Sequence, residues 1–208
     1  MKYKNWDDFK VGCASIQSIM SRPKNCNNLT AKEREKLNKL LAKEDKSQED
    51  FASIGDLNKK IENYVNPPLS ETCKKYLLSR YAPLKYNTVG ISVFQKRPCI
   101  QKGIDLEKSG IELVSKVTKV KYTRPNDYSQ NEYLVGLCDA ISSDGNTILE
   151  IKTSWSAASF MEARRLDKLS PTHFSQMQGY LNLYGVDKGL VCFTLINTPP
   201  HLIEQEIE

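Results

Sequence analysis

Two acidic residues and a lysine in the second half of the chain are spaced for hydrolytic chemistry. Asp139 lies in one apolar run, and Glu150 and Lys152 lie in the next. Residues two apart in a β-strand share a face, so Glu150 and Lys152 should point the same way, with Ile151 in the opposite layer. Paired carboxylates suit Mg²⁺, which takes oxygen ligands and keeps waters beside a phosphate substrate. The lysine could orient or deprotonate the attacking water, or stabilise phosphoryl charge.

The segments around these residues predict two antiparallel strands joined by a hairpin. Residues 133–141 form a short apolar run bounded by turn residues, and residues 147–153 form another. Between them, Asp144 and Gly145 form a pair that is typical of a hairpin turn. We therefore expect a buried strand that ends near Asp139 and an antiparallel partner that carries the other two residues.

Helices are expected before and after this hairpin. Residues 102–120 have apolar residues at helical spacing, weakened by Gly110. Ser170 and the proline that follows it begin a second helix, and Gly185 ends it. Residues 189–196 predict a last buried strand. The order of helix, strands, helix and strand predicts an α/β domain with a central mixed sheet flanked by helices.

The first hundred residues are expected to be helical and polar. Residues 5–20 show helical spacing before a Ser-Arg-Pro stop, and Thr30 begins a second helix with a capping box. Residues 69–81 predict a third helix, which Pro83 should end. Residues 43–56 are rich in charge and poor in apolar side chains, which predicts a flexible loop or an insertion tip.

Composition narrows the class of protein. The 208 residues are 39% hydrophobic and 26% charged, which fits one globular domain with or without a small appendage and excludes a disordered or collagenous chain. No apolar run approaches the roughly 18 to 20 residues of a membrane span, and residues 1–10 are too polar for a signal peptide, so we expect a cytoplasmic protein without membrane contacts. The six scattered cysteines argue against a zinc or iron–sulfur site and are expected to be reduced and mostly buried.

Charge is unevenly divided along the chain. Residues 1–100 hold 19 Lys and Arg against 11 Asp and Glu, whereas residues 101–208 hold 11 against 14. Phosphates attract cationic side chains, and divalent cations need carboxylates, so this division indicates a polyanion-binding surface beside an acidic site. The alternative is a basic balance that serves only solubility.

The spacing of the two acidic residues and the lysine also resembles a known sequence motif. Asp139 followed across the turn by Glu150-x-Lys152 resembles the motif of the PD-(D/E)XK nuclease superfamily, although Cys138 stands where that motif has proline.

Three further segments resemble the lambda-exonuclease, YqaJ and RecB-like branch of that superfamily. Gly103-x-x-x-Glu107 is similar to its first motif, on a helix, and Gln176-x-x-x-Tyr180 is similar to its QxxxY motif. One helical turn places the Gln and Tyr side chains on a single face. The segment that ends at Ser15 is similar to the opening helix of phage exonucleases, in which a serine lies near a DNA phosphate.

The resemblance implies a restriction-endonuclease-like core in residues 100–208 and an N-terminal helical region in residues 1–99 that forms part of a DNA-binding cleft. It implies DNA hydrolysis that depends on Mg²⁺, with Mn²⁺ as a substitute. Asp139, Glu150 and the Ile151 carbonyl would hold one metal ion, and Glu107 would help to hold a second. Two groups of residues complete the assignment: Lys152, Gln176 and Tyr180 for catalysis, and Ser15, Lys10, Arg22 and Trp155 for DNA contacts.

The same resemblance implies a phage-encoded exonuclease that resects double-stranded DNA ends in recombination. A homo-oligomer and a single-strand annealing protein are the expected partners besides DNA. Two rival functions remain: a structure-selective or single-strand endonuclease of the same fold, and a DNA-binding protein without turnover.

Each candidate residue also has an interpretation without chemistry. The two strand carboxylates and Lys152 could cap a turn or form an exposed cross-strand pair. Glu107 competes with Glu112 and could be a solvated helix position, while the Gln-Tyr pair could hydrogen-bond inside the domain. The DNA-contact candidates could cap a helix or pack at the rim of the core.

Overall fold

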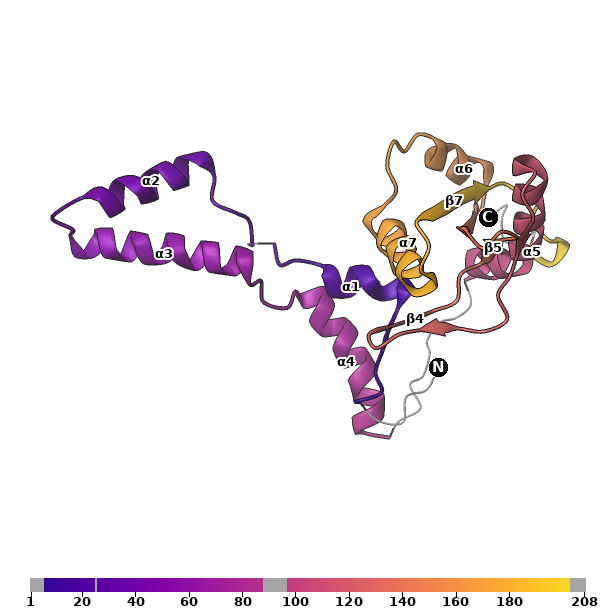
Figure 1. The fold of residues 1–208 in the computed structure, drawn as a ribbon, viewed down its shortest axis with the longest axis horizontal. Coiled ribbons are helices and arrows are strands. Elements are labelled where there is room, and N and C mark those ends of the chain that lie inside the picture. Colours follow the sequence, from indigo (N-terminus) through magenta and orange to yellow (C-terminus); the bar gives the residue numbers. More distant parts are fainter. Residues whose placement is uncertain (1–5, 25, 88–96, 203–208) are drawn as a thin grey trace. The chain divides into compact units, whose positions relative to one another are not determined.

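The computed structural model describes residues 6–24, 26–87 and 97–202 (Figure 1). In chain order the elements are β1 (Val11–Gly12), η1 (Cys13–Ser15), α1 (Ile16–Met20), α2 (Ala31–Ala42), α3 (Gln48–Val65), α4 (Glu71–Lys85), α5 (Pro98–Thr118), β2 (Tyr122–Thr123), β3 (Ser129–Gln130), β4 (Leu134–Gly136), β5 (Ala140–Ser142), β6 (Thr147–Thr153), α6 (Ala157–Arg164), α7 (Pro171–Tyr184), β7 (Lys188–Thr194) and η2 (Pro200–Leu202). Within these ranges, no helix has the length and apolar content that a membrane span needs.

The chain divides into two compact units. Unit 1 comprises Met1–Gln17 and Ala82–Glu208, and unit 2 comprises Ser18–Tyr81. This division differs from the expected boundary at residue 99. The reason is that β1 pairs with β4 and η1 packs against α7, which makes the start of the chain part of the core.

The described part of unit 1 contains two mixed sheets rather than a single central one. Their strand orders are β1-β4-β3 and β2-β5-β6-β7. In the second sheet β5 and β6 are antiparallel, as the hairpin predicted, while β6 and β7 are parallel along their whole length. The expected class of a mixed sheet architecture flanked by helices is therefore confirmed.

The apolar run at residues 133–141 is not one strand. It forms β4, which pairs with β1 and β3, and then β5, which pairs with β2 and β6. The chain passes from one sheet to the other through residues 137–139. Asp139 consequently lies directly before β5 instead of at the end of a strand, in the segment between the sheets.

Both faces of β6 are covered, because its side chains alternate between two hydrophobic clusters. Leu149 and Ile151 pack with Ile111 of α5, whereas Ile148 packs with Met177 of α7. Figure 1 shows the two helices on either side of the strands. Since residues two apart share a face, the side of β6 that carries Ile148 also directs its even-numbered polar residues toward α7.

Both helices predicted in the second half of the chain are present, and capping residues set the bounds of α7. Residues 102–120 lie almost entirely in α5, and α7 begins after Ser170, whose hydroxyl accepts a hydrogen bond from the His173 amide. Gly185 ends α7 in the left-handed conformation, with φ 64°. A glycine adopts this conformation without steric cost, which is why it stops a helix.

Close packing on α7 depends on Gly179. A Cβ atom at this position would lie 2.3 Å from Ile16 Cδ1 and 3.0 Å from Cys13 Sγ. The start of the chain can therefore approach the helix only because the residue has no side chain.

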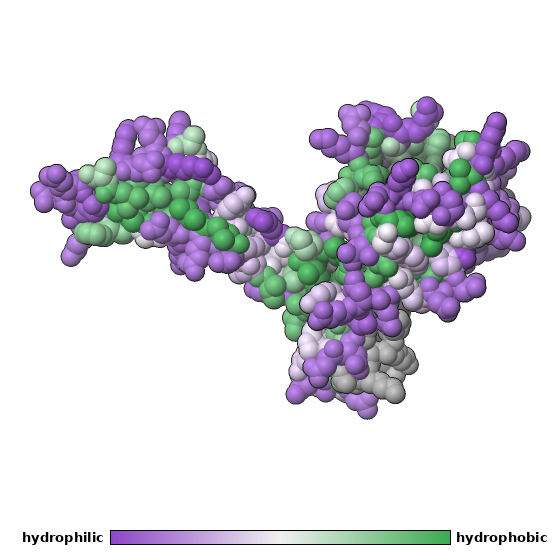
Figure 2. Space-filling view, viewed as in Figure 1, coloured by the Kyte–Doolittle hydropathy of each residue, from purple (hydrophilic) through white to green (hydrophobic). Residues whose placement is uncertain are grey.

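Unit 2 contains a hairpin of α2 and α3. The capping box that Thr30 predicted is present, and Leu37 of α2 packs with Leu57 of α3. Figure 2 shows apolar residues as a stripe along this hairpin, bordered by hydrophilic ones. The prediction of a flexible loop or an insertion tip at residues 43–56 was wrong from Gln48 onward, because Ser47 and Asp50 form a second capping box that starts α3.

One helix prediction near the start of the chain was also wrong. Residues 6–20 form β1, η1 and α1 rather than one helix, since Val11 is held in an extended conformation by pairing with Leu134; residue 5, where the prediction began, lies outside the described residues. The helix expected at residues 69–81 is present as α4, but Pro83 does not end it, because the proline lies inside the helix, which continues to Lys85.

All six cysteines are free of disulfides, as expected. Four are buried, whereas Cys99 is exposed and Cys192 is partly buried.

Candidate active site

The structure brings Asp139, Glu150 and Lys152 together at the end of the β5–β6 hairpin that lies away from its turn. Asp139 Oδ2 accepts a hydrogen bond of 2.7 Å from the Ile151 amide, which anchors its carboxylate on the neighbouring strand. Lys152 Nζ donates to Glu150 Oε1 at 2.6 Å, because both side chains leave the same face of β6. The carboxylate of Glu150 is buried, whereas the side chain of Lys152 is 27% exposed.

Gln176 of α7 fixes the orientation of this pair. Its Nε2 donates to Glu150 Oε1 at 2.8 Å and to the Tyr180 hydroxyl at 3.2 Å, while its Oε1 accepts from Lys152 Nζ at 3.4 Å. Gln176 and Tyr180 lie one helical turn apart and are both buried. The amide thus offers donors to the carboxylate and an acceptor to the ammonium group, which holds both in place.

Burial controls the protonation of the acidic pair. Burial, followed by the negative charge of Asp139, raises the pKa of Glu150 to about 7. The pKa of Asp139 is also raised by burial, although the Ile151 amide, Lys152 and Arg124 oppose that rise. Strongly perturbed carboxyls that face each other are more frequent at functional sites than elsewhere.

One atom of this cluster lacks a protein partner. Glu150 Oε2 is buried without any hydrogen bond, while its other oxygen takes bonds from Lys152 and Gln176. A buried carboxylate oxygen normally has a partner, because desolvating it otherwise costs free energy. An oxygen-binding cation such as Mg²⁺ would satisfy it.

The donor set fits an oxygen-binding cation such as Mg²⁺ better than a metal that prefers nitrogen and sulfur ligands, such as zinc. Asp139 and Glu150 supply carboxylate oxygens only, and Mg²⁺ is usually held by one or two carboxylates together with waters and substrate phosphates. Within the described residues, no group of three or more His, Cys, Asp and Glu side chains is arranged to hold a metal ion. The structure therefore offers an open pair of ligands rather than a closed cage.

Glu107 reaches the site from the other layer. It belongs to α5, which covers the face of β6 opposite Glu150, and its Oε1 accepts a hydrogen bond from Arg124 Nη1. Burial and then the charge of Asp139 raise its pKa, so the two carboxylates are electrostatic neighbours. Nothing in the motifs pointed to Arg124, which follows β2 in a polar stretch; only the pairing of β2 with β5 brings it here.

The candidate phosphate contacts near the start of the chain fall in different units. Ser15 ends η1 in unit 1, where Lys10 Nζ donates to Gln130 Oε1 at 3.2 Å. Arg22 belongs to unit 2, and its guanidinium lies 5.3 Å from the centre of the Tyr64 ring.

Trp155 follows β6 and is held from α5. Buried Lys102 donates from Nζ to the Trp155 carbonyl at 2.7 Å and to the Thr198 hydroxyl at 2.6 Å. The same ammonium lies 5.6 Å from the centre of the Trp155 ring, a cation–π distance. These contacts hold Trp155 against α5 and place Lys102, which sequence reasoning did not select, next to the end of β6.

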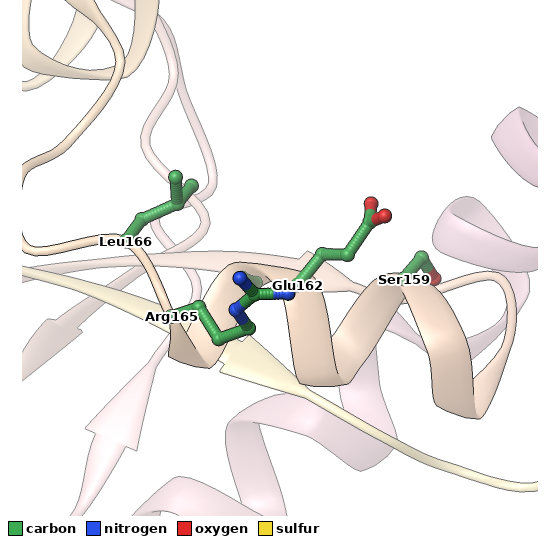
Figure 3. Close-up of a pocket in the computed structure, with 5 residues that line it drawn as sticks. Ser159, Glu162, Arg165 and Leu166 are labelled. Carbon is green, nitrogen blue, oxygen red and sulfur yellow. The ribbon is translucent and has the colours of Figure 1, made fainter.

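A surface hollow of about 490 Å³ lies along α6. Figure 3 shows Ser159, Glu162, Arg165 and Leu166 at its wall. None of the sequence-predicted site residues lines it.

Comparison with known proteins identifies the fold. No family model and no curated protein matches the sequence. Among solved structures, a phage-related exonuclease from Haemophilus somnus 129PT is similar over 96% of this chain and 74% of its own, with 22% identity and a TM-score of 0.63. An alkaline exonuclease from Laribacter hongkongensis is similar over 93% and 73%, with 13% identity and a TM-score of 0.56. The chain therefore has the fold of solved exonucleases, and the recognition suggested by its motifs is confirmed at the level of the fold.

Proposed function

We propose that this protein is a Mg²⁺-dependent exonuclease that hydrolyses phosphodiester bonds of DNA. The observation that carries the proposal is the pairing of Lys152 with Glu150, whose second carboxylate oxygen is buried without a partner, beside Asp139. Its setting in an exonuclease fold supports the choice of nucleic acid as substrate.

Asp139 and Glu150 are the proposed ligands of one Mg²⁺ ion, with the Ile151 carbonyl as a further ligand. Glu107 is the proposed ligand of a second ion, and Mn²⁺ should substitute because it accepts the same oxygen donors. When bound, a divalent cation would polarise the scissile phosphate and lower the pKa of an adjacent water.

The protein's own groups would prepare the substrate and the water. Lys152, the more exposed member of the pair, can donate a hydrogen bond to the attacking water or to a phosphate oxygen, where negative charge develops. Gln176 holds the side chains of Lys152 and Glu150 in position through hydrogen bonds, and the Tyr180 hydroxyl accepts a hydrogen bond from Gln176. Rigid support of this kind keeps reacting groups aligned.

The proposed substrate is a double-stranded DNA end, resected during phage recombination. Ser15, Lys10 and Arg22 are proposed to bind backbone phosphates, and Trp155 to stack on a base. Phosphate contacts carry little sequence information and weaken with salt, so weak sequence preference and strong salt dependence are expected. We further propose that the protein forms a homo-oligomer, that it acts with a single-strand annealing protein, and that it works in the host cytoplasm.

One set of assays tests this proposal against its rivals. End-labelled linear duplex, closed circular duplex and single-stranded DNA are each incubated with Mg²⁺ or EDTA, using the wild-type protein and the Lys152→Ala variant. Progressive shortening of linear duplex alone, lost in EDTA and in the variant, supports the exonuclease. Nicking of circles or cutting of single strands would support an endonuclease instead. Metal-independent binding without cleavage would support a DNA-binding protein without turnover.

A second variant tests the assignment of the acidic pair. Asp139→Asn should abolish cleavage while retaining DNA affinity, because the amide keeps the size of the side chain but loses the charge. Cleavage at the wild-type rate would remove Asp139 from the site.

A further inference from the structure

Arg124 occupies a position that the proposed mechanism does not use. It directly follows β2, in which Thr123 pairs with Ile141 of β5. Because the two strands are antiparallel, the chain that leaves Thr123 runs back along β5 toward Asp139. The pairing of β2 with β5 therefore places Arg124 near Asp139.

The side chain of Arg124 is bound to the site but remains open to solvent. Its Nη1 donates to Glu107 Oε1, and its positive charge also acts on Asp139, where it opposes the rise in pKa that burial causes. The side chain of Arg124 is 55% exposed, whereas that of Glu107 is 20% exposed. An incoming anion can therefore reach the guanidinium more easily than it can reach the carboxylate.

We propose that Arg124 is a DNA-phosphate-binding residue that leaves Glu107 for a phosphate oxygen when DNA binds. The inference rests on the proposed nuclease function and adds a substrate contact to it. A guanidinium group forms the same forked hydrogen bonds with phosphate as with carboxylate, so Glu107 occupies in the free protein the place that a phosphate takes in the complex. The exchange would also release the Glu107 carboxylate at the moment when substrate arrives.

The salt dependence of DNA binding tests the phosphate contact. Binding of a fluorescently labelled duplex to the full chain is measured by anisotropy in EDTA at several NaCl concentrations, so that no cleavage is needed. Arg124→Ala should weaken binding and make the slope of log K against log[salt] shallower by about 0.9, the value for one phosphate contact. Arg124→Lys should keep most of the slope, because the charge remains.

Lys108→Ala provides the matched control. Lys108 follows Glu107 on α5, its side chain is 89% exposed, and the substitution removes the same charge. We expect the Lys108 variant to keep the wild-type slope. An equal change in both variants, or none in Arg124→Ala, would overturn the inference.

The proposed exchange of Arg124 from Glu107 to a DNA phosphate is tested by removing the Glu107 carboxylate. Glu107→Gln should tighten DNA binding in EDTA, because Arg124 is then released from its carboxylate, and this gain should vanish in the Glu107→Gln, Arg124→Ala double variant. A gain of equal size with and without Arg124 would overturn the exchange, since it would reflect only the lost negative charge. Absence of DNA binding by the wild-type protein would instead overturn the proposed function, which keeps the two failures distinct.

Discussion

Replacing Glu150 with glutamine is expected to stabilise the metal-free protein at pH 8 much more than at pH 5. Glu150 is 4% exposed, and burial followed by the charge of Asp139 raises its pKa to about 7. Above that pH the native state holds a buried anion that the unfolded chain exposes to water. Glutamine keeps an oxygen acceptor for Lys152 and has nearly the same shape, but it carries no charge.

The sign and size of the effect follow from linkage. A carboxyl with a raised native pKa favours folding below its ordinary pKa of 4.5, and this contribution is lost as pH rises through about 7. At about 1.36 kcal/mol per pKa unit, the loss reaches roughly 3 kcal/mol at pH 8. For a protein of this size, that corresponds to a difference of about 6–12 °C in Tm.

Intrinsic fluorescence provides a selective assay. The chain has two tryptophans, Trp6 and Trp155, and both belong to unit 1, which holds the site. Thermal unfolding is followed in EDTA at pH 5 and pH 8 for the wild type, Glu150→Gln and Glu112→Gln. The last is a control, because Glu112 is an exposed carboxylate on α5, and its replacement should change stability by no more than about 0.5 kcal/mol.

Addition of Mg²⁺ completes the test. At pH 8 the ion should raise the Tm of the wild type, since the native carboxylates are its proposed ligands, and should raise that of Glu150→Gln much less. Equal Tm values for wild type and Glu150→Gln at pH 8 in EDTA, or a larger gain at pH 5, would refute the buried-anion reasoning.

Three further outcomes are expected. Lys152→Ala should lower kcat by roughly 10²- to 10³-fold with little change in DNA affinity in EDTA, whereas a loss confined to affinity would assign Lys152 to binding alone. Gln176→Ala should lower activity by about 10- to 100-fold, and wild-type rates across a Mg²⁺ titration would contradict its supporting role. Gly179→Ala should destabilise unit 1 by about 1–3 kcal/mol, because the new Cβ would meet Ile16, while Gly103→Ala, in open space, should stabilise α5 by up to about 1 kcal/mol; equal fluorescence-detected unfolding of both variants would contradict the packing argument.

Local chemistry made several elements predictable. The strand at residues 147–153 and the helix that begins at Pro171 appear where their sequences placed them. Their signals are contained in the segment itself: an apolar run after a turn, a serine cap before proline, and a terminal glycine. The hairpin pairing of β5 with β6 follows from the same local information.

Elements that depend on distant partners were harder to predict. Residues 133–141 contain one apolar run, yet they split because β1 recruits β4 into a separate sheet. The short extended segment at Val11 likewise exists only through its pairing with Leu134. The start of α3 is a different case, because the Ser47 capping box is a local signal inside residues 43–56, whose charged composition predicted a loop.

The sequence by itself determined which residues could do chemistry and that the side chains of Glu150 and Lys152 point in the same direction. Glu150 and Lys152 share a face because strand geometry alternates side chains, whatever surrounds the strand. Only the tertiary structure decided that Asp139 would bind the Ile151 amide, that Gln176 would join the carboxylate to the ammonium, and that Arg124 would reach Glu107. The residues in these contacts are 12, 26 and 17 positions apart in the chain, and the burial that raises the pKa of Glu150 arises from the layers packed around it.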